Sequence, residues 1–137
     1  MTLVNWEETE REVRDVGDAL ASTRTGVGHL TVAPAALSGP PHCHAAEEEI
    51  FLVLDGDGTL LLGDEEHPVR AGSVVARPPA TGVPHAFRAG DGPLTLLAFG
   101  TREPNDIAYF PRSGKVALRG IRARFFIQQV EYWDGEA

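Results

Sequence analysis

The sequence predicts a predominantly β fold, arranged as a sandwich or barrel. Short apolar runs recur about every ten residues between positions 26 and 100, and clusters of turn residues separate them. The chain contains 15 glycines and 10 prolines, so turns are frequent, while 42% hydrophobic residues are enough to form a packed interior. This pattern favours a sandwich or barrel over strands that alternate with helices.

Length and charge narrow the class of protein. A chain of 137 residues fits one domain and can bury a sizeable core. Its 20 acidic and 12 basic residues give a formal charge of −8, which argues against nucleic acid or anionic lipid as a partner. The N-terminus lacks a basic region followed by an apolar run, and no apolar stretch approaches membrane-spanning length. With Cys43 as the single cysteine, we expect no intrachain disulfide and a cytoplasmic location.

The first 25 residues carry weak structural signals. Asn5 and Glu8 have the spacing of a capping box that opens a short helical turn. Val13, Val16 and Leu20 are expected to pack against the main body, or else to belong to an arm that lies across a partner subunit.

From residue 26 the sequence predicts a series of strands. After a strand at 27–34, a short histidine-bearing segment precedes a strand at 48–54. Residues 55–58 read Asp-Gly-Asp-Gly and predict a hairpin, because Asp-Gly supplies the positive backbone dihedrals of tight turns. The partner strand of that hairpin is expected at 59–62. The further expected strands are 73–76, 85–88, 94–99 and, after a less regular stretch, 124–130.

A cluster of histidines and acids is the main candidate for chemistry. His42 and His44 lie on one face of an extended strand, because successive side chains alternate between faces. A turn or bulge could bring one carboxylate of the acidic run 47–49 beside them, and His85 is a possible fourth ligand. Imidazole and carboxylate ligands suit divalent manganese, iron, nickel or zinc and leave positions open for water or substrate.

These residues also have a reading without a metal. His42 and His44 would then be exposed histidines on an edge strand, and His85 a core histidine. Glu47 and Glu48 would form a solvated charge run, the usual position of such residues. In either reading we expect Cys43 to be a small apolar side chain on the opposite face from its neighbouring histidines.

The same stretch resembles a known sequence motif. Gly39, the pair His42-x-His44, and Glu49 followed by six residues and Gly56 resemble the first motif of the cupin superfamily. In that family the two histidines and the glutamate are metal ligands.

A second stretch resembles the second cupin motif. Gly72, five residues, Pro78 and then His85 approximate it, with Ala80 where glycine is usual. Taken together, the resemblance implies metal ligation by His42, His44, Glu49 and His85. Glu48 is the reserve candidate for the acidic ligand.

The resemblance covers residues 26–100 and implies a double-stranded β-helix, or jelly-roll barrel, with the metal inside. We therefore expect one domain over residues 1–137, with short irregular arms at 1–25 and 101–137. Exposed barrel edges and these arms favour a homodimer, which the resemblance also implies.

The resemblance does not name a reaction, because cupins include isomerases, decarboxylases, dioxygenases and binding proteins. We expect an enzyme that acts on a small polar molecule through one divalent Fe, Mn, Ni or Zn ion. The alternative is a non-catalytic cupin that binds or senses a sugar or carboxylic acid. A third possibility is a barrel with a vestigial metal site whose role is assembly.

Two groups of arginines remain. Arg77 and Arg88 flank the second motif and are expected either to meet an anionic substrate or to be surface charges. Arg119, Arg122 and Arg124 form a basic cluster in an acidic chain. Arg122 and Arg124 share a face at two-residue spacing, as an anion site or as a solvated edge that discourages aggregation.

Overall fold

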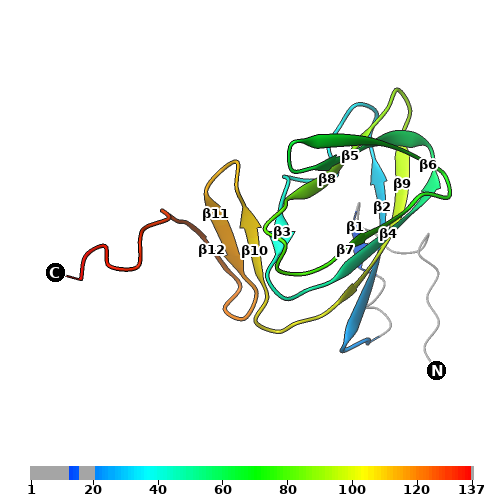
Figure 1. Cartoon of the computed structure of the whole chain (residues 1–137). Helices are drawn as coiled ribbons and strands as arrows, with labels where there is room; N and C mark the ends of the chain where they lie inside the picture. Colours follow the sequence, from blue (N-terminus) through cyan, green and yellow to red (C-terminus); the bar gives the residue numbers. More distant parts are fainter. Residues whose placement is uncertain (1–12, 16–20, 137) are drawn as a thin grey trace.

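The computed structural model describes residues 13–15 and 21–136, and all regular secondary structure in them is β-strand (Figure 1). The strands are β1 (Val13–Asp15), β2 (Thr25–Val32), β3 (Cys43–His44), β4 (Glu49–Asp55), β5 (Asp57–Leu62), β6 (Glu65–Arg70), β7 (Val74–Arg77), β8 (His85–Ala89), β9 (Leu94–Thr101), β10 (Ile107–Phe110), β11 (Lys115–Leu118) and β12 (Ala123–Phe126). Within these ranges there is no helix that could span a membrane. The predicted all-β class is confirmed.

The strands form three antiparallel sheets. The large sheet has the order β1-β2-β9-β4-β7, and the small sheet has the order β6-β5-β8. A third sheet, here called the C-terminal sheet, has the order β12-β11-β10-β3. In Figure 1 the small sheet faces the large sheet, and the C-terminal sheet extends to one side of them. Strand order does not follow chain order, as expected for a jelly roll.

The hydrophobic core fills the space between the large and small sheets. Alternate residues of a strand point to the same face, so the strands of these two sheets contribute one side of their sequence to the core. On β9, for example, Leu94 and Leu96 are completely buried. The aromatic rings of Phe51 on β4 and Phe87 on β8 pack 5.0 Å apart, joining the two layers. The remaining buried core residues are Val32, Val53, Leu60, Val69 and Ala89.

The small sheet and the C-terminal sheet meet at one pair of histidines. The amide of His85 donates to the carbonyl of His42 at 2.8 Å, and the amide of His42 donates to the carbonyl of His85 at 3.2 Å. This single bridge joins the start of β8 to the residue before β3. The two sheets therefore form a nearly continuous layer with the histidines at the junction.

The turn at residues 55–58 exists, but the predicted pairing of its flanking strands is wrong. β4 pairs with β7 and β9 in the large sheet, whereas β5 pairs with β6 and β8 in the small sheet. Gly56 has φ of 83°, and a Cβ there would lie 2.2 Å from the carbonyl oxygen of Pro93. The Asp-Gly signal specifies a sharp bend, and here the bend carries the chain from one layer to the other.

The C-terminal region is more regular than expected. β6 lies in a stretch where no strand was predicted, and residues 101–126, expected to be mostly irregular, contain β10, β11 and β12. These strands are four residues long and do not alternate between polar and apolar residues, so alternation does not reveal them. The late strand predicted at 124–130 ends at Phe126.

Several predictions stay open. The capping box of Asn5 and Glu8, and the packing of Val16 and Leu20, fall outside the described residues. The single domain over 1–137, the homodimer and the cytoplasmic location also stay predictions.

Replacing Leu96 with alanine should lower the free energy of unfolding by about 2–5 kcal/mol, because the substitution leaves a cavity between the two sheets. Urea denaturation measures this loss. As a control, Val74→Ala changes a side chain that is 66% exposed on β7, and its effect should stay within about 0.5 kcal/mol. Equal losses for the two variants would contradict the assignment of the core.

Candidate metal centre

Three imidazoles and one carboxylate meet at the junction of the sheets. His42 lies in the bridge before β3, and His44 lies on β3 itself. Glu49 and His85 are the first residues of β4 and β8. The four predicted ligands therefore come together from all three sheets. Glu48, the reserve candidate, is exposed, and its amide donates to Thr101 Oγ1 at 3.0 Å.

Three of the four residues have donor atoms close enough to share an ion. His42, Glu49 and His85 each offer a ligand atom within 4.8 Å of the others. His44 is not part of this set and approaches it through Glu49: Glu49 Oε2 lies 3.1 Å from His85 Nε2 and 3.5 Å from His44 Nε2. Ligands about 2.1 Å from an ion are about 3.0 Å apart at right angles and about 3.4 Å apart in a tetrahedron. The distances from Glu49 Oε2 to His85 Nε2 and to His44 Nε2 are close to these values.

Hydrogen bonding fixes which nitrogen of His44 is free. Nδ1 lies 2.6 Å from the carboxylate of Asp106, an acceptor, so Nδ1 carries the proton. When Nε2 is unprotonated, it presents a lone pair toward Glu49. Both His44 Nε2 and Glu49 Oε2 are buried and neither makes a well-aligned hydrogen bond, although Glu49 Oε2 also lies 3.1 Å from His85 Nε2. Two facing acceptors require a cation or a proton between them, so these residues fit a metal ion.

The electrostatics of the cluster favour the forms that bind metal. Burial lowers the pKa of His42, and the nearby His85 and His44 lower it further. The Pro40 carbonyl, which accepts from Nδ1 at 2.9 Å, acts in the opposite direction, but the pKa is lowered overall. Burial alone would raise the pKa of Glu49, but the contact with His85 and the charges of the histidines outweigh it, so the pKa is lowered. Neutral imidazole and ionised carboxylate are the ligating species.

A second acidic network lies behind His44, and no motif in the sequence indicates it. Asp106 is 2% exposed and also accepts from the amides of Ala46 and Glu47. Burial would raise the pKa of Asp106, but these donors and His44 lower it overall. Asp106 is 62 residues from His44 in the sequence, in a stretch with no motif. Only the pairing of β10 with β3 brings the two together.

Glu47 is not part of a solvated charge run, contrary to that reading of the sequence. It is 5% exposed, and its carboxylate accepts from the amide of Glu103 and from Arg119. Burial raises the pKa of Glu47 despite these two donors. His44, Glu47 and Asp106 could also group around an ion, but the two acids already have donors. The set with unpartnered atoms is the better metal candidate.

The two arginines that flank the second motif differ in position. Arg77 lies beside the cluster, in a narrow cavity that it lines together with His44, Glu49 and His85. Its Nη2 donates to Thr81 Oγ1 and to the carbonyl of Val83, while its Nε is buried and unpartnered. Arg88 instead forms an exposed ion pair with Glu66.

The loop between β7 and β8 keeps its shape without the usual glycine. Ala80 has φ of 59°, in the left-handed region, and its amide donates to the carbonyl of His44 at 2.9 Å.

Cys43 is buried, and burial raises the pKa of its thiol, which agrees with an unreactive apolar role.

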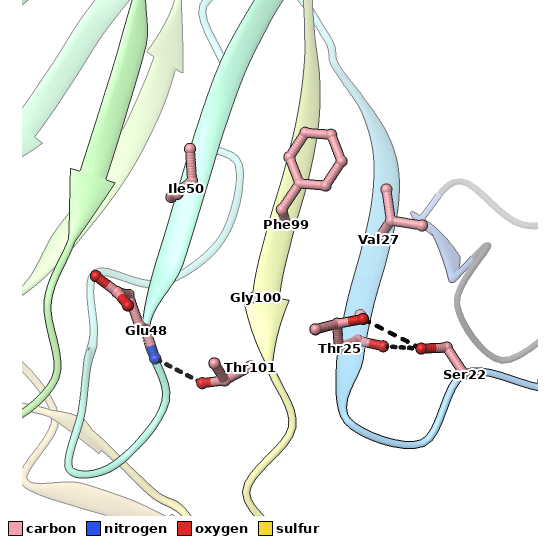
Figure 2. A pocket seen from close by; sticks show the side chains of 9 residues that line it. Ser22, Thr25, Val27, Glu48, Ile50, Phe99, Gly100 and Thr101 are labelled. Carbon is pink, nitrogen blue, oxygen red and sulfur yellow. Dashed lines mark hydrogen bonds between the residues drawn. The ribbon is translucent and has the colours of Figure 1, made fainter.

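A larger cavity lies elsewhere and lacks such chemistry. Figure 2 shows Val27, Ile50 and Phe99 side by side on the outer face of the large sheet, where they line a cavity of about 460 Å³. None of the four candidate ligands lines it. We therefore place the candidate site at the junction of the sheets.

A β sandwich that gathers histidines and a carboxylate at its strand ends defines a class of all-β proteins with a candidate metal centre. The cupin domain family matches residues 28–100, more than half of the chain. The chain belongs to this family. No curated protein sequence is significantly similar to it.

Solved structures support the assignment. A provisionally named sugar phosphate isomerase from Acidithiobacillus ferrooxidans is 26% identical, with a TM-score of 0.77, over 87% of this chain and 80% of that chain. A sugar phosphate isomerase from a cupin superfamily, from Silicibacter pomeroyi, is 30% identical, with a TM-score of 0.72, over 76% and 67%. The polyketide cyclase RemF from Streptomyces resistomycificus is 26% identical, with a TM-score of 0.63, over 75% and 80%.

Protein purified without a metal-affinity column should carry near-stoichiometric divalent metal, and His42→Ala and His85→Ala should each lose it. Elemental analysis measures the content. His67→Ala is the matched control, because His67 is exposed and paired with Glu65 on β6. A wild type that neither contains metal nor takes it up on reconstitution would refute the site.

Asp106→Asn should weaken metal affinity by about 10- to 100-fold, because an amide nitrogen facing Nδ1 would favour the His44 tautomer that protonates Nε2. Competition with a chromophoric chelator measures the affinity, and ¹⁵N chemical shifts of the ring report the tautomer. Asp64→Asn, in an exposed turn, is the control. Unchanged affinity and tautomer would show that Asp106 does not orient the ring.

Proposed function

We propose that this cupin is a metal-dependent isomerase of small hydroxylated carbonyl compounds of the sugar type. The observation that carries the proposal is the buried convergence of His44 Nε2 and His85 Nε2 on Glu49 Oε2, at 3.5 Å and 3.1 Å. An ion between them would be held by His42, His44, Glu49 and His85. It would supply Lewis-acid polarisation of a carbonyl oxygen.

Two relatives support isomerisation over the other reactions expected of a cupin. The proteins from Acidithiobacillus ferrooxidans and Silicibacter pomeroyi, at 26% and 30% identity, are both named as sugar phosphate isomerases. These names describe the two relatives only. Because this chain is similar to both, isomerisation is the first reaction class to test.

The chain's own residues would orient the substrate. Arg77 Nε is a buried donor without an acceptor, and it lines the same narrow cavity as Glu49 and His85. The cavity has no room for a water molecule, so a ligand oxygen would reach this Nε only after the surrounding side chains move. The buried position of His85 and the half-buried position of Glu49 would limit water around the reacting atoms.

The test is interconversion of aldoses and ketoses, with and without phosphate, by protein loaded in turn with Mn, Fe, Ni and Zn. We expect at least one aldose–ketose pair to interconvert, as followed by NMR. Glu49→Gln should reduce the rate by about 100-fold or more, because it removes the charged ligand. His67→Ala should leave the rate unchanged.

Other outcomes would select other functions. Calorimetric binding of a sugar or carboxylic acid without turnover would favour the non-catalytic binding module. Oxygen uptake or release of carbon dioxide would favour a dioxygenase or a decarboxylase, and the isomerase proposal would be wrong.

A further inference from the structure

We propose that a groove on the C-terminal sheet, next to His44, is a subsite for the phosphate group of the substrate. The inference rests on the proposed isomerase function and names its substrate class: phosphate monoesters of small sugars. The groove has a volume of about 390 Å³, and it is lined by His44, Asp106, Ala108, Ala117, Leu118, Arg119, Arg122, Ala123 and Arg124.

Strand register places an arginine and a candidate metal ligand on the same face. His44, Ala108, Ala117 and Arg124 lie directly opposite one another across β3, β10, β11 and β12. Opposed residues of antiparallel strands point to the same side of a sheet. Three strand spacings of about 4.8 Å separate the backbone of His44 from that of Arg124, which makes about 14 Å in total.

The residues between these ends leave room for a ligand. Ala108 and Ala117 carry only a methyl group each, so they form a low floor between the longer side chains of His44 and Arg124. A small molecule lying on this floor would have one end at the guanidinium and the other at the imidazole. His44 lines both this groove and the narrow cavity that contains Glu49 and His85.

The charge of the groove suits an anion. Among the described residues, Arg122 and Arg124 form no ion pair, whereas Arg119 is bound to Glu47. Asp106 adds a negative charge, but its oxygens already accept from His44 and from two backbone amides. Two free guanidinium groups thus remain in a chain whose net charge is −8.

Arginine is suited to this ligand. A planar guanidinium can donate two parallel hydrogen bonds to phosphate oxygens, and these charge-assisted bonds are stronger than neutral ones. Two arginines can balance the charge of a phosphate monoester. A carboxylate or free phosphate shares part of this chemistry, so the test must separate a phosphorylated sugar from both.

The test compares binding of D-ribose 5-phosphate, D-ribose, D-ribonate and inorganic phosphate to the metal-loaded protein by calorimetry. We expect the phosphorylated sugar to bind at least about tenfold more tightly than D-ribose. The double variant Arg122→Gln/Arg124→Gln should lose this preference. Arg112→Gln, in the turn between β10 and β11 and outside the groove, is the matched control and should keep it. Inorganic phosphate should compete with the phosphorylated sugar in the wild type only.

The outcomes separate the subsite from the proposed reaction. Equal affinity for the two sugars, a preference that survives in the double variant, or equal binding of D-ribonate and D-ribose 5-phosphate would overturn the subsite, even if an isomerase activity is found. A phosphate preference that depends on the two arginines would support it, even if no sugar is turned over and the reaction proposal fails. Far-ultraviolet circular dichroism of the double variant checks that it is folded.

Discussion

The pair of backbone hydrogen bonds between His42 and His85 is the constraint on which the rest of the site depends. It is the bridge between the small sheet and the C-terminal sheet, and it sets the separation of two imidazole rings, 5.1 Å between centroids. Because the bonds are made by the backbone, ring placement does not depend on side-chain packing alone. The large sheet then supplies Glu49 opposite them, held by its own pairing with β7 and β9.

A polar cluster at this position costs folding free energy. Removing charged and polar groups from water is unfavourable unless each group is paired. Asp106 and Glu47 meet that requirement with backbone amides and Arg119, while His44 Nε2 and Glu49 Oε2 do not. The core between the sheets, with Leu94, Leu96 and Phe87 buried, provides the stability that allows this local cost.

The sequence predicted the parts of this protein that follow local rules. Alternation and turn residues located most strands of the two main sheets, and the His42-x-His44 spacing pointed to the candidate metal centre, which stays a prediction. The sequence could not show that the chain passes from the large sheet to the small sheet at Gly56, because a bend does not specify which strands pair. It also could not show Asp106, because that contact depends on β10 lying beside β3. Short strands and long-range contacts are set by the tertiary structure.

The position of Asp106 links two places that differ in chemistry. Its carboxylate accepts from Nδ1 of His44, and the other nitrogen of that ring faces Glu49. Asp106 also lines the groove on the C-terminal sheet that contains Arg122 and Arg124. A ligand that shifts Asp106 would change the basicity of His44, and an ion on His44 would polarise the contact with Asp106 in return. If an ion and an anion occupied these two places, their binding would be thermodynamically coupled, and the coupling would act equally in both directions. Anion concentration would then influence the affinity of the candidate centre for a metal ion.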